Sequence, residues 1–169
     1  MGIVKWATRA ALATSAAILV PAVAGATTTT NGNLPVSATI STVCTLSTSA
    51  VAFGTVSTIS GSSVDAAGGI DVTCTNGASW TAAADVGSGS GATFTTRKMT
   101  SGSDLLDYTL YTDSGHSNVW GDGSSGNATF SGTGSGSSQS LTVYGRIAAG
   151  QTAAPAGSYS DTVAVTVTY

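Results

Sequence analysis

The sequence predicts an all-β domain of the immunoglobulin-like sandwich type. Gly, Ser, Thr, Ala and Val dominate the chain, and charged residues make up only 8% of it. Thr and Val favour strands, whereas Gly, Ser and Asn favour turns. Short alternating apolar and polar runs recur with such turns between them, and helix signals are almost absent after the N-terminal region. Many short strands joined by turns are typical of a two-sheet sandwich.

The first 26 residues are interpreted as a secretory signal peptide that is not part of the fold. Lys5 and Arg9 form a positive N-terminal region, an apolar stretch follows at residues 10–20, and residues 24–26 (AGA) match a small-residue cleavage site. The apolar stretch is too short to span a bilayer, which disfavours a membrane anchor. Cleavage would leave 143 of the 169 residues, which suits one domain.

The first alternating run lies directly after this signal. Residues 27–33 are polar and low in complexity, and we expect them to be flexible in a free subunit. Residues 34–40 then alternate, with Leu34, Val36, Ala38 and Ile40 on one face. Pro35 suits an edge strand or the start of a strand.

Further strands are predicted along the rest of the chain by period-two alternation and by flanking turn residues. They lie at residues 44–46, 51–56, 70–74, 80–86, 94–99, 106–112, 119–120 and 141–147. Loops are predicted at residues 59–69, 87–91, 132–138 and 148–157. Residues 159–169 form the last predicted strand, with Val163, Val165 and Val167 on one side and Thr162, Thr166 and Thr168 on the other.

Cys44 and Cys74 are the only cysteines, and such a pair in an exported protein is expected to form a disulfide. The strands that carry them must then lie side by side or face each other across the core. In the chain-entropy model this bond would stabilise the fold by roughly 3–4 kcal/mol. No metal site is expected, because His116 is the only histidine and no other cysteine remains.

The charge balance excludes one class of partner. The mature chain would carry three basic residues, Arg97, Lys98 and Arg146, against eight Asp and no Glu, a formal charge of −5. Nucleic-acid binding is not expected, because no basic patch is available for phosphates. Catalysis is not expected either, since there is no G-x-S-x-G motif and a Ser–His–Asp triad would depend wholly on His116.

Several segments considered together identify a family resemblance. They are LYTD at residues 110–113, VWGDG at 119–123, LTVYGRI at 141–147, PAGSYSDTV at 155–163 and the terminal VTVTY, with Cys44 and the VTC that ends at Cys74. In this order and spacing they resemble the spore coat protein U-like family, which includes major subunits of archaic chaperone–usher pili such as the Csu pilus. The resemblance covers nearly all of the mature chain.

The resemblance implies an incomplete immunoglobulin-like sandwich that lacks its last strand. In this family a periplasmic chaperone temporarily fills the resulting groove. An outer-membrane usher then exchanges the chaperone strand for the N-terminal extension of the next subunit, which is a form of β-augmentation. Identical or related pilin subunits thus form a head-to-tail polymer. The implied location is an extracellular surface fibre reached through the periplasm, with no cofactor.

Applied to this chain, the resemblance implies that residues 27–40 are the donor strand and that residues 41–169 form the pilin domain. The inserting residues would be Leu34, Val36, Ala38 and Ile40. If Pro35 marks the start of the insert, the set shortens to the last three, and Ile40 could instead belong to the first strand of the fold. The acceptor groove would be lined partly by Val163, Val165 and Val167, and the Tyr169 carboxylate would anchor basic residues of the chaperone.

The leading interpretation is a structural pilus subunit that polymerises by donor-strand exchange into a fibre for attachment and biofilm formation. One alternative is a non-polymerising secreted coat or matrix protein of the same family, which would use residues 27–40 to close on itself or on one partner. A second alternative is an extracellular sugar-binding module, which would need an exposed Trp80 or Trp120. Aromatic residues of this kind are more often part of a core or an interface.

Overall fold

The structure is a computed structural model that describes residues 25–169. Residues 1–24, which hold most of the predicted signal peptide, lie outside the described residues. The chain divides into two units, Met1–Ala38 and Thr39–Tyr169. Residues 25–38 of the first unit contain no helix or strand, and every one of these residues is exposed. The alternating residues 34–40 therefore form no strand here, because they have no pairing partner among the described residues.

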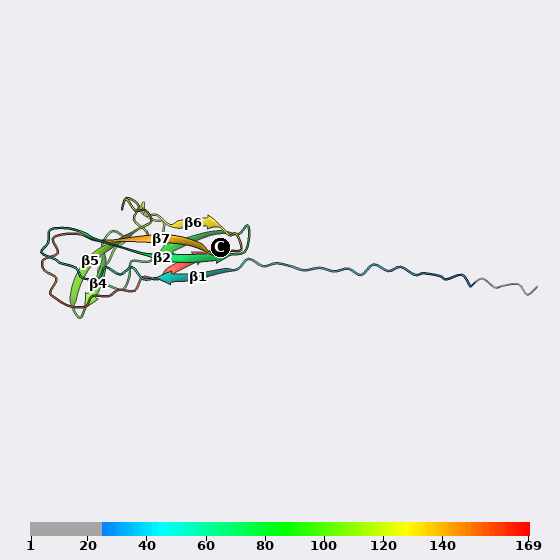
Figure 1. Ribbon diagram of the computed structural model, residues 1–169. Helices are drawn as coiled ribbons and strands as arrows, with labels where there is room; N and C mark the ends of the chain where they lie inside the picture. The colour runs from blue at the N-terminus through cyan, green and yellow to red at the C-terminus, as the bar shows by residue number, and fades with distance from the viewer. Residues whose placement is uncertain (1–24) are drawn as a thin grey trace, which may run out of the picture. The chain divides into compact units, whose positions relative to one another are not determined.

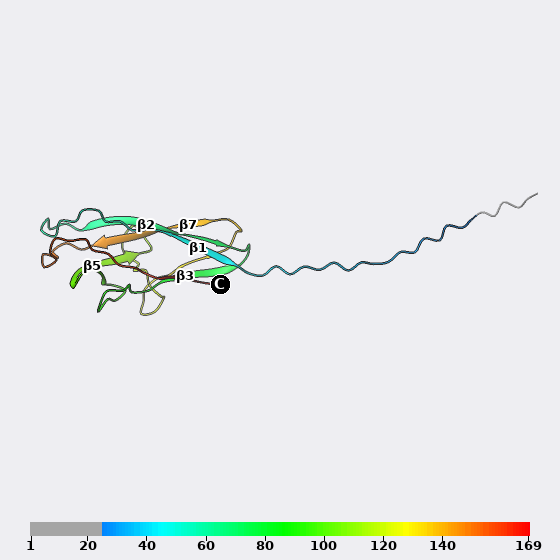
Figure 2. The same cartoon turned by 90° about the horizontal axis from the view of Figure 1, so that it is seen from below.

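The second unit is an all-β sandwich of two antiparallel sheets, and no helix occurs among the described residues (Figures 1 and 2). One sheet has the order β1-β2-β7-β5-β4 and the other has the order β6-β3-β8. The strands are β1 (Cys44–Ser49), β2 (Val64–Cys74), β3 (Ser79–Ala84), β4 (Arg97–Ser101), β5 (Asp104–Tyr111), β6 (Phe130–Thr133), β7 (Gln139–Ile147) and β8 (Val165–Thr168). Within residues 25–169, no helix is long and apolar enough to cross a membrane.

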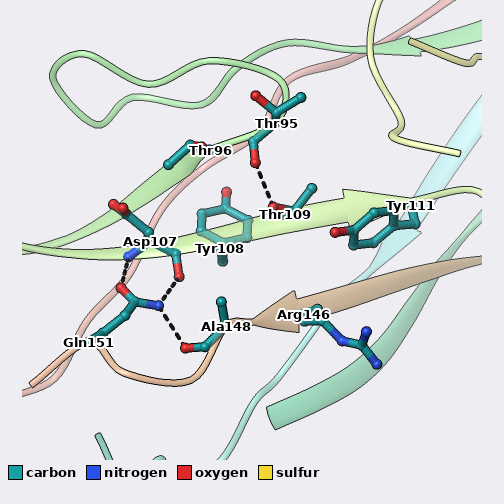
Figure 3. Close-up of a pocket in the computed structure, with 9 residues that line it drawn as sticks. All are labelled: Thr95, Thr96, Asp107, Tyr108, Thr109, Tyr111, Arg146, Ala148 and Gln151. Atoms are coloured by element: carbon teal, nitrogen blue, oxygen red, sulfur yellow. Dashed lines mark hydrogen bonds between the residues drawn. The ribbon is translucent and has the colours of Figure 1, made fainter. Parts of the chain in front are cut away.

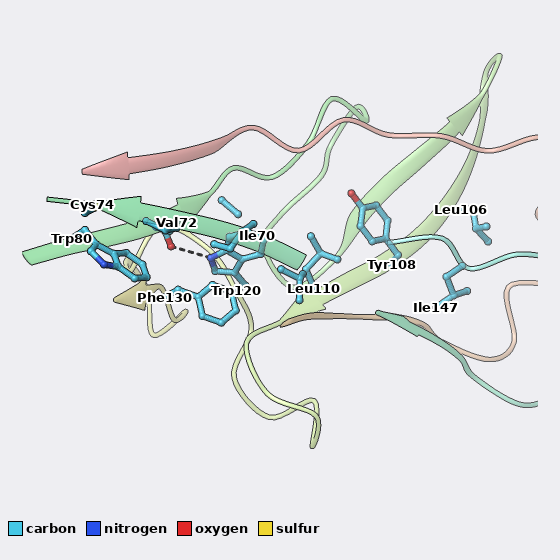
Figure 4. Packing of buried hydrophobic residues seen from close by; sticks show 13 residues of the cluster. Ile70, Val72, Cys74, Trp80, Leu106, Tyr108, Leu110, Trp120, Phe130 and Ile147 are labelled. Atoms are coloured by element: carbon cyan, nitrogen blue, oxygen red, sulfur yellow. Dashed lines mark hydrogen bonds between the residues drawn. The ribbon is translucent and has the colours of Figure 1, made fainter. Parts of the chain in front are cut away.

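The core lies between the two sheets and is formed by alternate residues of the strands, as period-two patterns require. Ile70, Val72 and Cys74 of β2 are buried on one face, and alternate residues of β5, β7 and β3 join them (Figure 4). The Trp120 and Phe130 rings pack edge to face with centroids 5.2 Å apart. Edge-to-face contact is a favoured geometry for aromatic pairs.

The disulfide prediction is confirmed, and the structure decides how the two strands meet. Cys44 and Cys74 are bonded to each other. They occupy directly opposite positions on the neighbouring antiparallel strands β1 and β2, with Cα atoms 4.1 Å apart. The bond therefore lies within one sheet and does not cross the core.

Several predicted elements differ from the observed ones. Residues 51–56 form no strand, and residues 119–120 form only isolated bridges. β2 begins at Val64, inside a predicted loop, because Gly68 and Gly69 hide its alternation in the sequence. A Cβ atom at Gly68 would lie 2.7 Å from the backbone of Ala50, so glycine lets the segment that follows β1 pass close to β2 at this point. β6 was likewise predicted as a loop in part, since Gly132 and Ser131 are poor strand formers.

Candidate functional site

The last strand lies at a free edge of the smaller sheet. β8 pairs with β3 from Thr168 opposite Thr81 to Val165 opposite Ala84. Among the described residues, β8 has no partner on its other side. An unpaired edge of this kind presents a row of backbone N–H and C=O groups that can pair with a further strand.

The side chains of this segment alternate between core and solvent. Val163, Val165 and Val167 are half-buried and pack against the core, whereas Ala164, Thr166 and Thr168 are exposed. This is the division of faces that the sequence predicts. The three valines keep part of their apolar surface accessible, although they contact the core. A strand placed beside β8 could cover that surface.

The first strand forms the matching edge of the larger sheet. β1 pairs only with β2 among residues 25–169, and its Cys44 and Leu46 are half-buried. In Figure 1, β1 and the red C-terminal strand β8 are drawn along the same side of the sandwich. Two unpaired edges, each with partly buried apolar side chains, therefore border the same side of the core.

The segment that follows β1 adds further apolar side chains. Val51, Phe53 and Val56 are half-buried and pack against the core, although residues 51–56 belong to no strand. A Cβ atom at Gly145 of β7 would lie 2.6 Å from Val51 Cγ1 and 2.8 Å from Phe53 Cζ. The glycine thus lets this segment lie close to the larger sheet. The segment is held by its side chains and not by a β-ladder.

The predicted donor residues are all exposed. Leu34, Val36 and Ile40 have 85%, 87% and 86% of their surface accessible. Ala38 is exposed as well. Almost all of their apolar surface is therefore available for burial against a partner. Ile40 lies outside β1, which begins at Cys44.

Two aspartates hold the chain immediately before β8. Asp161 Oδ1 accepts hydrogen bonds from the Ser88 backbone N–H at 2.8 Å and from the Ser88 hydroxyl at 2.6 Å. Asp161 Oδ2 accepts one from the Tyr108 hydroxyl at 2.7 Å, and Asp85 Oδ1 accepts one from the Ala164 N–H at 2.9 Å. Partial burial acts to raise the pKa of Asp161, but the hydrogen bonds from Ser88 outweigh it and hold the pKa below its usual range.

These hydrogen bonds explain why β8 is shorter than predicted. Residues 159–169 alternate throughout, yet only Val165–Thr168 pair as a strand. The residues before Val165 are positioned by side-chain carboxylates and by the bridge between Ser160 and Thr100. The approach to the free edge is therefore fixed, even though it contributes little to the ladder.

Arg97 is the residue that sequence reasoning missed. The sequence places it in the predicted strand 94–99 as an ordinary basic residue, but its surface is 0% accessible. Its guanidinium donates to the carbonyl oxygens of Asp85 at 2.8 and 3.0 Å, Phe94 at 3.0 Å and Trp120 at 2.7 Å. Burial lowers its pKa, an effect that nearby Tyr108 partly offsets. Arg97 thus ties the loop between β3 and β4 to the loop between β5 and β6.

A polar hollow, shown in Figure 3, has a volume of about 220 Å³ and lies on the outer face of β5 and β7. Its polar groups bind one another: Gln151 hydrogen-bonds the Asp107 backbone N–H and C=O, each at 2.7 Å, and Lys98 Nζ lies 2.7 Å from Asp107 Oδ1. No group of three potential metal ligands occurs in residues 25–169.

Both tryptophans among the described residues are core residues. Trp80 and Trp120 are 3% and 2% accessible. The Trp120 indole N–H donates to the Ala82 carbonyl at 3.1 Å, and the Trp80 indole N–H donates to Gln139 Oε1 at 3.1 Å. Neither ring is available to stack on a sugar, so the sugar-binding alternative loses the exposed residues that it required.

Comparison with known proteins identifies the family of the chain. Residues 30–166 match the family model of the Spore Coat Protein U domain. The chain belongs to the Spore Coat Protein U domain family. No protein of established annotation gives a significant match to the chain.

Chains of solved structures are similar to this Spore Coat Protein U domain, and they include one from Acinetobacter baumannii. It is part of the crystal structure of the CsuC–CsuE chaperone–tip adhesion subunit pre-assembly complex from archaic chaperone–usher Csu pili. The TM-score is 0.58 and the identity is 20%, over 78% of this chain and 40% of that chain. The domain therefore spans less than half of that chain's length, and the likeness concerns the fold.

The limits of the family match bear on the extension. The Spore Coat Protein U domain begins at residue 30 in this chain, before the exposed residues Leu34 and Ile40. It ends at residue 166, within β8. The exposed alternating residues 34–40 and the first two residues of β8 therefore both lie within the matched range.

Proposed function

We propose that this chain is a structural pilus subunit that polymerises by donor-strand exchange. The observation that carries the proposal is the pair of unpaired strand edges, β1 and β8, on one border of the sandwich. The exposed segment 27–40 of the same chain, which alternates over residues 34–40, offers the strand that such a border can accept. The structural likeness to a complex of a chaperone and a pilus tip subunit supports this assignment.

In the proposed assembly, residues 27–40 of one subunit lie beside β8 of another. Backbone hydrogen bonds along the free edge supply affinity, and alternate side chains set the register. Leu34, Val36, Ala38 and Ile40 then face the core beside Val163, Val165 and Val167. Full burial of an exposed aliphatic side chain contributes about 1.5–3 kcal/mol, which favours the larger members of this set.

The same border serves a periplasmic chaperone before assembly, and an outer-membrane usher exchanges the two strands. The chaperone protects an edge that would otherwise aggregate. Tyr169 is 57% accessible at the end of β8, where its carboxylate can meet a basic residue of the chaperone. The product is an extracellular fibre for surface attachment and biofilm growth, with a structural and not a catalytic role.

The experiment that tests the proposal compares the mature chain, residues 27–169, with a variant that starts at residue 41. Both are purified with the chaperone and examined by electron microscopy after its release. Fibres from the full chain alone support donor-strand exchange. Fibres from both chains would place assembly elsewhere, and fibres from neither would favour a coat protein that closes on itself or on one partner.

A peptide assay then identifies the inserting face. A synthetic peptide of residues 27–40 should bind the variant that starts at residue 41. Val36→Asp in the peptide should abolish binding, because it places a charge in the core-facing row. Ser37→Asp is the matched control, since the same charge then lies on the opposite face and should weaken binding little. Equal loss with both peptides would contradict the proposed register.

A further inference from the structure

The point where the extension joins the domain is unusually well fixed. Thr75 follows β2, and its Oγ1 accepts a hydrogen bond from the Val43 N–H at 3.0 Å. The same hydroxyl lies 3.4 Å from the Ser41 carbonyl oxygen and 3.3 Å from that of Val43, so it can donate to either. The Thr75 N–H donates to the Val43 carbonyl at 2.9 Å, and the Cys44–Cys74 disulfide lies beside this pair. Residues 41–44 are therefore part of the rigid domain.

This anchor leaves no linker between the proposed donor strand and the domain that carries it. The donor segment ends at Ile40, and Ser41 already contacts Thr75. If residues 34–40 insert into another subunit, the next residue of the chain is fixed to its own domain. Two subunits joined by strand exchange must then lie directly against each other.

The strand directions indicate which surfaces meet. All strand pairs of the described sheets are antiparallel. β8 runs toward Tyr169, which lies at the same end of the sandwich as the start of β1 (Figure 2). We call this the disulfide end, defined by Val43, Thr75 and Tyr169. A donor strand antiparallel to β8 would have Ile40 at the other end.

That other end includes the loop of residues 50–63, the turn between β4 and β5 that carries Asp104, and the loop that follows Ile147. The loop joins the end of β1 to Val64, which pairs with Ile147 at the far end of β2 from Cys74. β2 has 11 residues, so the two ends are about 33 Å apart at 3.3 Å per step. Ile59 of this loop is 85% accessible. We call this the Ile59 end.

The chemistry of the two ends suits contact between copies. The loop of residues 50–63 contains no charged residue, and neither do the segments 75–78 and 134–138 of the disulfide end. All eight Asp of the chain lie outside these segments. Val43, beside the anchor, adds an apolar side chain that is 55% accessible. Charged groups at the two ends include the Tyr169 carboxylate and Asp104, but the segments named here carry none. Subunits that share a net negative charge can therefore approach through these segments with less repulsion than through charged parts of the surface.

We propose that Thr75 anchors residues 41–43 so that neighbouring subunits of the fibre meet without a linker, with the disulfide end of the donor against the Ile59 end of the acceptor. The partner of both surfaces is thus a second copy of this chain. This inference rests on the proposed donor-strand exchange and adds a defined interface to it. Thr75 is a positioning residue, because it fixes the direction and limits the movement of residues 41–43, from which the donor segment extends.

Two measurements on fibres of the full mature chain test this interface. Thr75→Val keeps the side-chain shape but removes the hydroxyl. Its control is Thr45→Val on β1, where the hydroxyl that is lost donates only one long hydrogen bond, of 3.5 Å, to the Thr73 carbonyl oxygen of β2. Thr75→Val should bind the peptide of residues 27–40 as the wild type does, yet form fibres with a persistence length at least two-fold shorter in electron micrographs. Thr45→Val fibres should be as stiff as those of the wild type.

The second measurement does not depend on Thr75 variants. A photo-crosslinking amino acid, benzoylphenylalanine, replaces Ile59 or, as a control, the exposed Ser131 on β6. From Ile59, mass spectrometry should find adducts with residues 41–44 or 75–77 of the neighbouring subunit, and from Ser131 it should not. Adducts from Ile59 to another surface, or Thr75→Val fibres of unchanged stiffness, would refute this inference alone. Absence of fibres from the wild-type chain would refute the proposed function and this inference with it.

Discussion

Arg97 provides the sharpest test of how this sandwich is held together. Arg97→Met removes four hydrogen bonds and leaves the carbonyl oxygens of Asp85, Phe94 and Trp120 without their donor. Each buried polar group left unsatisfied costs about 1–3 kcal/mol. The variant also avoids the cost of burying a cation, which offsets part of this loss. We expect the free energy of unfolding to fall by about 3–5 kcal/mol.

The assay is urea unfolding of the mature chain followed by tryptophan fluorescence, because both of its tryptophans are buried. Lys98→Met is the matched control, since it removes the adjacent cation and its surface pair with Asp107. That pair should contribute less than about 1 kcal/mol. Arg97→Lys should be almost as unstable as Arg97→Met, because one ammonium group cannot reach three carbonyls. A loss below about 1 kcal/mol for Arg97→Met would refute the assigned role.

Three further outcomes are expected. Replacing Cys44 and Cys74 by Ser should lower the free energy of unfolding by about 3.6 kcal/mol in the chain-entropy model for a separation of 30 residues, and an unchanged urea midpoint would contradict this. Because the pKa of Asp161 is lowered in the folded state, the carboxylate stabilises the fold above its ordinary pKa of 3.8, and this stabilisation is lost as the pH falls below that value. Asp161→Asn should therefore reduce the loss of unfolding free energy at acid pH. An unchanged pH dependence would contradict this. Gly68→Ala should lower the free energy of unfolding by about 1–3 kcal/mol, because its methyl group meets the backbone of Ala50. Wild-type stability in thermal melts would contradict this and would show that the backbone near Ala50 moves away without cost.

Period-two patterns predicted the faces of the strands well. Leu106, Tyr108 and Leu110 alternate within the predicted strand 106–112, and they form the buried face of β5. The alternation from Val163 to Val167 likewise separates the half-buried from the exposed side chains. The side chain of a strand points to one face or the other whatever its partner is, so the local pattern is sufficient. The pairing of Cys44 with Cys74 could also be predicted, although its position within one sheet could not.

Features that depend on distant parts of the chain were not predictable. Gly132 looks like a loop residue, yet it lies in β6. Glycine is needed there because a Cβ atom would be 2.7 Å from the ring of Trp80. Arg97 looks like a solvated cation, but its carbonyl partners come from residues 3 to 23 positions away and meet only in the folded chain. Neither a glycine that makes room for a ring nor a buried cation leaves a periodic signal in the local sequence.

Three alternating segments were predicted as strands, and their outcomes differ in an informative way. Residues 34–40 and 51–56 pair with nothing in the described chain, and residues 159–169 pair only over Val165–Thr168 and on one side. A pattern of period two reflects selection for two unlike faces, but it cannot specify where the pairing strand comes from. A chain that supplies its neighbour's strand should contain alternation without an internal partner, both in the donor and beside the accepting edge. The mismatch between the predicted and observed strands is thus itself an argument for exchange between subunits.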